Sequence, residues 1–186
     1  VRPTALSGFV GQEHLVGDGA ALARAIAEDR VPSAVFFGPP GTGKTTLARI
    51  VAAATGAAFE ELSAVQVGKA EVREVIERAR LRLGTSGQRT ILFLDEIHRF
   101  NKAQQDALLP AVEEGLLTLI GATTENPYFE VNSALLSRAQ VYELRPLTSE
   151  HVMALLAKIL FEDVPNMKAR ATQYEAMSAL VAGRAK

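Results

Sequence analysis

Short apolar runs alternate with amphipathic stretches along most of the chain. Apolar runs that stop at glycine or acidic residues are typical of buried parallel strands, whereas apolar residues three and four positions apart indicate helices. Strands are expected at 34–37, 59–62, 90–94, 116–120 and 141–144, and helices at 20–29, 44–54, 70–83 and 102–114. Strands that alternate with helices at this spacing predict an α/β fold, with a five-stranded parallel sheet and helices on both faces.

A change of pattern at Pro146 predicts a domain boundary. Residues 1–146 are expected to form the core domain, and residues 147–186 a second, smaller unit. Thr148 can cap a new helix. The apolar face of that helix would comprise Val152, Leu155, Leu156 and Ile159.

Composition narrows the class of protein. The chain has 186 residues with 48% apolar and 22% charged residues, which is ordinary for a globular protein. It contains no cysteine, which excludes disulfides and thiolate zinc sites. The N-terminus shows no apolar leader, and no run of 18 apolar residues occurs, so neither export nor a membrane span is expected. The formal charge of −1 requires any contact with nucleic acid to come from a local patch.

The clearest chemical motif lies between the first predicted strand and the helix after it. Residues 38–45 fit G-x-x-x-x-G-K-[ST] at every fixed position, in the strand-to-helix context that a phosphate-binding loop requires. Its glycines let backbone N–H groups surround phosphate oxygens, and the helix N-terminus adds partial positive charge. Lys44 is expected to reach the β and γ phosphates of ATP, and Thr45 to bind Mg²⁺. The predicted nucleotide-binding residues here are Gly38, Pro39, Pro40, Gly41, Thr42, Gly43, Lys44, Thr45 and Thr46.

An acidic pair follows the third predicted strand. Asp95 and Glu96 come directly after an apolar run, and α/β folds bind ligands at the carboxyl ends of their strands. Asp95 is expected to hold Mg²⁺, and Glu96 to orient and deprotonate the attacking water. Such a pair can also be a simple helix N-terminal feature, but its place downstream of a complete phosphate loop favours hydrolysis.

Two further positions are candidates for catalysis. The polar loop 122–126 is placed to sense the γ-phosphate, with Thr124 the first choice and Asn126 the second, although both residue types also form ordinary turns. Arg138 lies just before the last strand and is either a surface ion-pair residue or an arginine finger for a neighbouring subunit's ATP. A finger contributes a factor of about 10³–10⁵ in rate, so this second interpretation makes activity depend on oligomers.

These segments together resemble the clamp-loader branch of the AAA+ ATPases. The resemblance is carried by Arg2-Pro3, residues 10–15, the phosphate loop and Ser137-Arg138. Residues 95–110 and 120–132 are similar to the bacterial replication-associated recombination protein A (maintenance-of-genome-stability) family, which is related to the Werner-helicase-interacting ATPase. The resemblance covers residues 2–160 and implies an AAA+ P-loop core followed by the start of a helical lid. It adds Gly11 and Gln12 to the nucleotide-binding candidates.

The resemblance also implies a function. It points to a Mg²⁺-dependent, DNA-stimulated ATPase that acts at stalled or damaged replication forks, in replication restart, recombination and repair. The implied partners are DNA ends and single-strand/double-strand junctions, single-stranded DNA-binding protein, and further copies of the chain, with a tetramer expected for the full-length family. The expected location is cytoplasmic and nucleoid-associated, away from membranes.

The chain departs from the family pattern after about residue 161. The family continues with a lid that carries a Gly-Asp-Ala-Arg-type second sensor, and this sequence contains no such motif. Residues 174–180 are instead similar to the family's segment just beyond the lid. The chain is therefore expected to be a fragment with internal residues missing.

Other functions share the same ATP chemistry. A Holliday-junction branch-migration motor also carries Gly-Ala-Thr-Thr after its fourth strand, but residues 98–110 favour the fork ATPase. A clamp-loader subunit is less favoured, because some of these subunits carry a cysteine-rich zinc module and this chain contains no cysteine. A protein unfoldase would place an aromatic loop after the second strand, whereas residues 63–69 contain no aromatic residue. A scaffold that does not hydrolyse ATP would not need Lys44, Asp95, Glu96 and Arg138 together.

A basic segment is the candidate DNA contact. Residues 69–89 hold six basic and three acidic side chains, a local charge of +3 (six minus three). Lys69, Arg73 and Arg80 are expected to project from one flank, and Arg99 and Lys102 follow the acidic pair on a segment that faces the DNA channel in clamp loaders. Phosphate contacts from these residues would be largely independent of sequence. The alternative is a solvated helix with ion pairs such as Glu74–Arg78.

Overall fold

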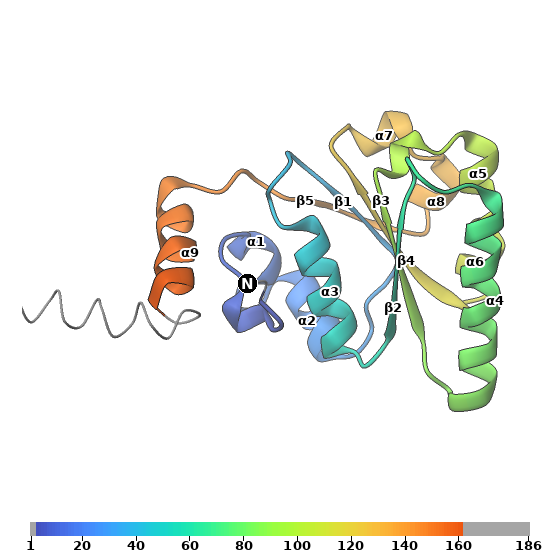
Figure 1. The fold of residues 1–186 in the computed structure, drawn as a ribbon, viewed down its shortest axis with the longest axis horizontal. Helices are drawn as coiled ribbons and strands as arrows, with labels where there is room; N and C mark the ends of the chain where they lie inside the picture. The colour runs from blue at the N-terminus through green and yellow to red at the C-terminus, as the bar shows by residue number, and fades with distance from the viewer. Residues whose placement is uncertain (1–2, 162–186) are drawn as a thin grey trace, which may run out of the picture. The chain divides into compact units, whose positions relative to one another are not determined.

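The computed structural model describes residues 3–161 (Figure 1). One compact unit ends at Pro146 and a second begins at Leu147. The segment 174–180 and the region expected to hold a second sensor lie outside the described residues. Within 3–161, no helix combines the length and apolar character that crossing a membrane requires.

The first unit is built on a five-stranded sheet in the order β2-β3-β4-β1-β5. Each neighbouring pair runs parallel, which confirms the predicted sheet. Parallel strands covered on both faces are continuous apolar runs, as 91–94 is in this sequence. The strands are β1 (Ala34–Phe37), β2 (Ala58–Ser63), β3 (Thr90–Asp95), β4 (Leu117–Thr123) and β5 (Gln140–Glu143).

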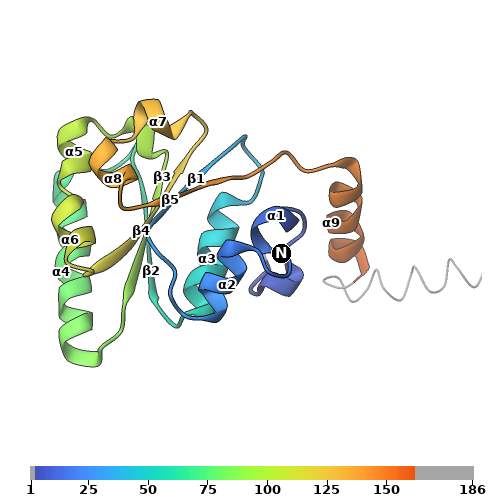
Figure 2. The same ribbon diagram turned by 180° about the vertical axis from the view of Figure 1, so that it is seen from behind.

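Helices cover both faces of this sheet (Figures 1 and 2). One face carries α1 (Glu13–Val16), α2 (Ala21–Ala27) and α3 (Lys44–Ala54), with the short turn η1 (Leu6–Gly8) beside them. The other carries α4 (Lys69–Ser86), α6 (Leu109–Glu113) and α8 (Ser133–Leu136). The turn η2 (Ile97–Arg99), α5 (Lys102–Asp106) and α7 (Pro127–Glu130) follow the carboxyl ends of β3 and β4.

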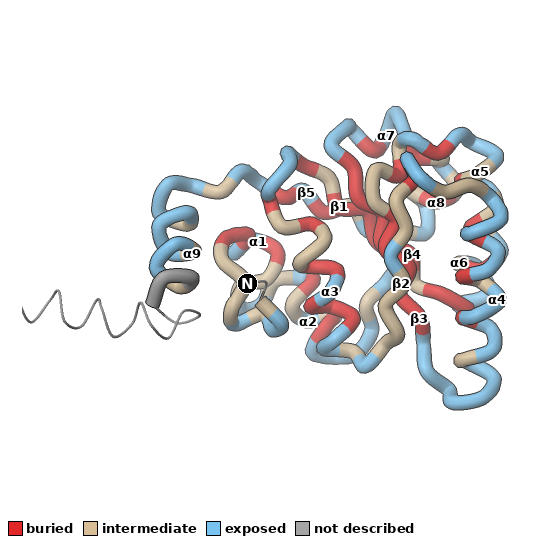
Figure 3. Tube along the Cα trace, viewed as in Figure 1, coloured by how far each residue is buried: buried red, intermediate tan, exposed pale blue. Residues whose placement is uncertain are grey.

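The core is divided between the two faces because successive side chains of a strand point in opposite directions. Ile91 and Phe93 pack under α2 and α3, whereas Leu92 and Leu94 pack under α4 and α6. Figure 3 shows the buried positions concentrated along the central strands and the inner sides of the helices. The sheet's carboxyl edge is thereby held rigidly from both sides.

The expected helix at 102–114 is wrong in one respect, because the structure has two short helices there. Helix α5 ends at Asp106, and α6 begins at Leu109 with Pro110 in its first turn. Proline has no N–H to donate to the carbonyl four residues earlier, and its ring crowds that carbonyl. The continuous apolar periodicity of the segment concealed this break.

The fourth strand is longer than expected. Residues 121–123 belong to β4 and not to the polar loop, because Gly121, Ala122 and Thr123 pair with Val35, Phe36 and Phe37 of β1. Gly121 also admits the side chain of Ile97, since a Cβ at Gly121 would lie 2.9 Å from Ile97 Cδ1. The polar loop therefore begins at Thr124.

The second unit contains helix α9 (Ser149–Phe161). The backbone N–H of His151 donates to Thr148 Oγ1 at 3.2 Å, and the N–H of Val152 donates to the Thr148 carbonyl at 3.0 Å. The predicted cap at Thr148 is thus confirmed, because its hydroxyl satisfies one of the free N–H groups of the first turn.

Candidate active site

The loop between β1 and α3 has a backbone that its glycines make possible. Gly38 has φ of 145°, and a Cβ there would lie 2.1 Å from the carbonyl oxygen of Leu144. Gly41 and Gly43 have φ of 77° and 98°, in the region that side chains disfavour. The Thr42 hydroxyl donates to the Pro39 carbonyl at 2.9 Å and closes the loop on itself. The motif's glycines are therefore required by geometry.

A pocket of about 350 Å³ opens over this loop. Its position at the carboxyl edge of the sheet is where open α/β folds bind ligands. The first N–H groups of α3 have no acceptor within the helix, so this end favours an anion. The pocket brings together three segments that are distant in sequence, and its lining consists of Pro40, Gly41, Thr42, Gly43, Lys44, Thr45, Thr46, Asp95, Glu96 and Thr124.

Lys44 is the buried cation of the pocket, with 9% of its surface exposed. Its Nζ donates to the carbonyl oxygens of Gly38 at 2.6 Å and Pro39 at 3.0 Å. Burial lowers the pKa of Lys44, and the carboxylates of Asp95 and Glu96 oppose that shift. A partly dehydrated ammonium interacts more strongly with a phosphate than one in open water.

Asp95 and Glu96 lie where the sequence predicts, at the end of β3. Asp95 Oδ1 accepts the N–H of Glu96 at 3.1 Å. Glu96 has φ of 54° and ψ of 43°, a left-handed conformation that non-glycine residues seldom adopt outside functional turns. Asp95 and the Thr45 hydroxyl share one pocket, and Mg²⁺ binds through few protein oxygens together with phosphates and waters. These two residues therefore suit a Mg²⁺–nucleotide complex.

The two candidates for γ-phosphate sensing differ in position. Thr124 lines the pocket. Asn126 does not line it, and its side-chain oxygen accepts the N–H of Tyr128 at 3.0 Å, which caps α7. Asn126 therefore has a structural reason to be present, and Thr124 remains the better candidate.

Gln12 supports the phosphate loop from behind. It is buried, and its amide nitrogen donates to the carbonyls of Thr42 at 3.3 Å and Arg145 at 2.7 Å. Its amide oxygen accepts the N–H of Arg145 at 2.8 Å. Neither Gly11 nor Gln12 lines the pocket, so a direct contact from either to the nucleotide stays a prediction.

Arg138 lies at the opposite edge of the sheet from the phosphate loop. It lines a second hollow with residues 31–33, Gly115, Leu117 and Thr118, which precede or begin β1 and β4. Its guanidinium pairs with Glu113 at 2.7 Å and donates to the Ala134 carbonyl at 2.9 Å. Because the phosphate loop lies at the carboxyl edge, Arg138 does not reach the pocket of its own chain.

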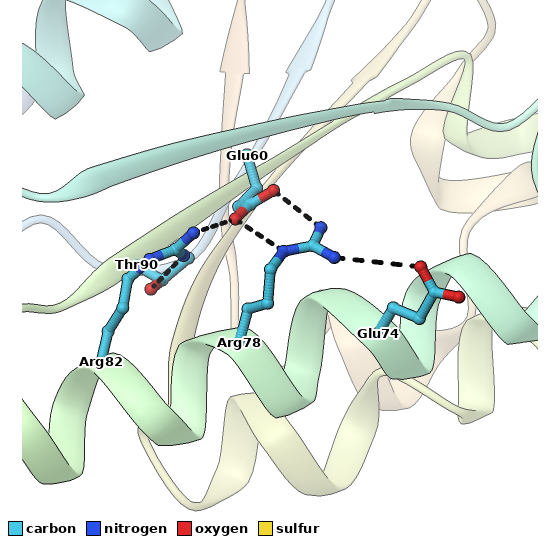
Figure 4. A network of polar contacts seen from close by, with 5 residues as sticks. All are labelled: Glu60, Glu74, Arg78, Arg82 and Thr90. Atoms are coloured by element: carbon cyan, nitrogen blue, oxygen red, sulfur yellow. Dashed lines mark hydrogen bonds and ion pairs between the residues drawn. The ribbon is translucent and has the colours of Figure 1, made fainter.

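Most basic side chains of residues 69–89 form ion pairs with nearby carboxylates. Arg78 and Arg82 both contact Glu60 of β2, and Arg78 also lies 3.9 Å from Glu74 (Figure 4). Arg80 pairs with Glu77, and Arg89 with Asp29. The predicted Glu74–Arg78 pair is thus confirmed. Of the predicted flank, only Lys69 and Arg73 make no ion pair within residues 3–161.

Glu60→Gln is expected to lower the free energy of unfolding by about 1–2 kcal/mol at pH 7, because two arginines lose a charged acceptor. Hydrogen bonding from Arg78 holds the pKa of Glu60 below its usual value. A carboxyl whose pKa is lower in the folded state stabilises above its unfolded pKa, and this contribution disappears as pH falls through the folded pKa. Urea unfolding at pH 7 and in acid, below the folded pKa, should therefore show a difference that shrinks at the lower pH.

Glu61→Gln is the matched control for this prediction. Glu61 is the next residue of β2 but faces the other side, where it pairs with Arg49 and both side chains are well exposed. Exposed pairs contribute roughly 0–1 kcal/mol, so a small change is expected. Equal effects of the two substitutions would contradict the importance of the Glu60 network.

A phosphate loop, a buried lysine and a carboxylate pair around one pocket define a P-loop nucleoside triphosphatase. Residues 34–147 match the family model described as ATPase family associated with various cellular activities (AAA). The chain therefore belongs to this family of ATPases.

Relatives narrow the comparison within that family. The chain is 53% identical over 160 residues to replication-associated recombination protein A of Escherichia coli (strain K12), covering 86% of this chain and 36% of the relative. It is 50% identical over 160 residues to ATPase WRNIP1 of Dictyostelium discoideum, covering 86% and 18%. Among solved structures, the RuvB Holliday junction branch migration motor of Thermotoga maritima matches with a TM-score of 0.68 and 33% identity, over 84% of this chain and 53% of that one. The chain thus spans about a third or less of the length of these two curated relatives.

Proposed function

We propose that this chain is the core of a DNA-dependent ATPase that acts at stalled or damaged replication forks. The observation that supports the ATPase assignment most directly is the pocket in which the phosphate loop, Asp95, Glu96 and Thr124 meet. The 53% identity to a protein named for replication-associated recombination supplies the biological setting. DNA ends and single-strand/double-strand junctions are the proposed substrates.

The proposed chemistry is Mg²⁺-dependent hydrolysis of ATP. Lys44 binds the β and γ phosphates together with the loop N–H groups. Thr45 and Asp95 would hold Mg²⁺, which would neutralise phosphate charge. Glu96 orients the attacking water and accepts its proton, while Thr124 contacts the γ-phosphate. Arg138 completes the site of the adjacent copy.

The proposed partners follow from this assignment. The full-length protein assembles as a homo-oligomer, because Arg138 lies away from its own pocket and needs a neighbour's ATP to act on. The family resemblance implies that this homo-oligomer is a tetramer. Contacts with single-stranded DNA-binding protein and a cytoplasmic, nucleoid-associated location are proposed on the same resemblance. The exposed side chains of Arg99, Lys102, Lys69 and Arg73 remain candidates for phosphate contacts.

ATP hydrolysis by the full-length protein is expected to rise several-fold with forked or gapped DNA, because single-strand/double-strand junctions are the proposed substrates. The measurement compares no DNA, single strands, blunt duplex, a forked junction and an unfolded model protein, with and without EDTA. Lys44→Ala serves as the control for contaminating ATPases. Stimulation by unfolded protein alone would favour an unfoldase, and a rate indifferent to every DNA would overturn the DNA-dependent assignment.

A branch-migration motor is the second candidate, and the structural match to RuvB favours it. The two functions differ in substrate. A four-way junction that stimulates ATP hydrolysis and migrates in a strand-displacement assay would favour branch migration over the fork ATPase.

A further inference from the structure

His98 lies between the proposed catalytic carboxylate and the loop that follows β4. Its Nε2 is 3.2 Å from Glu96 Oε2, and its Nδ1 is 2.9 Å from Thr123 Oγ1. The imidazole is largely enclosed, with 9% of the side chain exposed, whereas the Glu96 side chain is 33% exposed. One ring therefore contacts both Glu96 and the residue that precedes Thr124.

The hydrogen bonds from Glu125 through Thr123 and His98 to Glu96 can all be donated toward Glu96. The N–H of Glu125 donates to Thr123 Oγ1 at 3.0 Å, so that oxygen already accepts one hydrogen bond. The Thr123 hydroxyl can donate to His98 Nδ1 at 2.9 Å or to the Glu125 carbonyl at 3.4 Å, and the shorter contact is to His98. Nδ1 then accepts, and a neutral imidazole carries its hydrogen on Nε2 and donates it to Glu96.

The framework around His98 is rigid. Ile97 is fully buried and packs against Gly121 of β4, which fixes the turn η2 against the sheet. Thr123 pairs with Phe37 in the sheet, and its carbonyl accepts the N–H of Gly38 at 3.2 Å. His98 is therefore anchored to the strands that support the phosphate loop. Of the two side chains in contact, Glu96 is more exposed than His98.

We propose that His98 is a positioning residue that orients the Glu96 carboxylate and couples it to the γ-phosphate-sensing loop. The Thr123–His98–Glu96 contacts hold the carboxylate in a fixed place relative to Thr124, the neighbour of Thr123 that lines the pocket. The inference rests on the proposed role of Glu96. It differs from a purely structural histidine in predicting an effect on turnover that is separate from folding and ATP binding.

The test compares His98→Leu, which removes both ring nitrogens, with His98→Gln, which keeps an N–H donor, and with Thr123→Val. The full-length protein is assayed with DNA for kcat, KM for ATP and melting temperature. His98→Leu is expected to lower kcat about 10–100-fold through misplacement of Glu96. KM is expected to change by less than about twofold, since the phosphate loop is untouched. His98→Gln should recover part of kcat.

A double-mutant cycle tests the coupling. Because Thr123 acts through His98, Thr123→Val combined with His98→Leu should lower kcat no further than His98→Leu alone. Additive losses would overturn the coupling, and a normal kcat in folded His98→Leu would overturn the positioning role. If His98→Leu does not fold, His98→Gln and Thr123→Val decide: normal kcat in both would overturn the proposal.

Glu96→Gln separates this inference from the proposed function. Normal turnover in Glu96→Gln would remove the catalytic assignment itself, and with it the basis of the proposal. Loss of turnover in Glu96→Gln together with normal turnover in the His98 and Thr123 variants would overturn the role of His98 alone.

Discussion

Glu96→Gln is expected to bind ATP with nearly unchanged affinity while its kcat falls by about 10²–10⁴-fold. The amide keeps the size of the carboxylate but cannot accept the proton of the attacking water. Lys44 and the loop N–H groups, which would hold the phosphates, are unaltered by this change. Steady-state hydrolysis and equilibrium binding of a fluorescent ATP analogue measure the two effects separately.

Glu28→Gln is the control for this substitution, because Glu28 is an exposed carboxylate at the end of α2 that does not line the pocket. It should hydrolyse ATP at the wild-type rate. Normal turnover in Glu96→Gln would show that another group activates the water.

Arg138→Ala is expected to bind ATP and assemble, yet to hydrolyse about 10³–10⁵-fold more slowly. The arginine lies at the amino edge of the sheet, so its guanidinium can stabilise charge only at a neighbour's ATP. Mixing Arg138→Ala with Lys44→Ala should restore part of the activity, because the Lys44→Ala subunit supplies the missing arginine to an intact phosphate loop.

Arg24→Ala, which alters an exposed arginine of α2, is the control for this experiment. It should hydrolyse ATP at the wild-type rate, because it keeps both Lys44 and Arg138. Failure of Arg138→Ala and Lys44→Ala to complement each other in a confirmed mixed oligomer would contradict action between subunits. Full activity of Arg138→Ala alone would show that Arg138 has no catalytic role and serves only as an ion-pair partner of Glu113.

The parts of the site that could be predicted are those encoded in short segments. The phosphate loop is recognisable because its glycines, lysine and threonine act within eight consecutive residues, 38–45, and need no distant partner. Asp95 and Glu96 are predictable because they follow an apolar strand, and strand ends share one edge of a parallel sheet. The same argument predicts the loop after β4 as a sensing loop, and the pocket contains Thr124 but not Asn126.

Some departures from the sequence-based expectations had local signals that were outweighed. Pro110 marks the break between α5 and α6, but the apolar periodicity of 102–114 continues through it. His98 directly follows the acidic pair and Ile97, yet a histidine in a turn has no distinctive pattern. Its contact with Thr123 depends on β4, which places Thr123 beside it.

The sequence by itself determined the class of fold, the phosphate loop and the carboxylate pair, because each depends on periodicity or on residues adjacent in the chain. Only the tertiary structure decided that Gln12 braces Thr42 and Arg145, that Glu60 neutralises Arg78 and Arg82, and that Arg138 faces away from its own pocket. These contacts join residues that are far apart in the chain or fall at opposite edges of the sheet. Their formation depends on strand order and helix packing, which no local pattern of residues specifies.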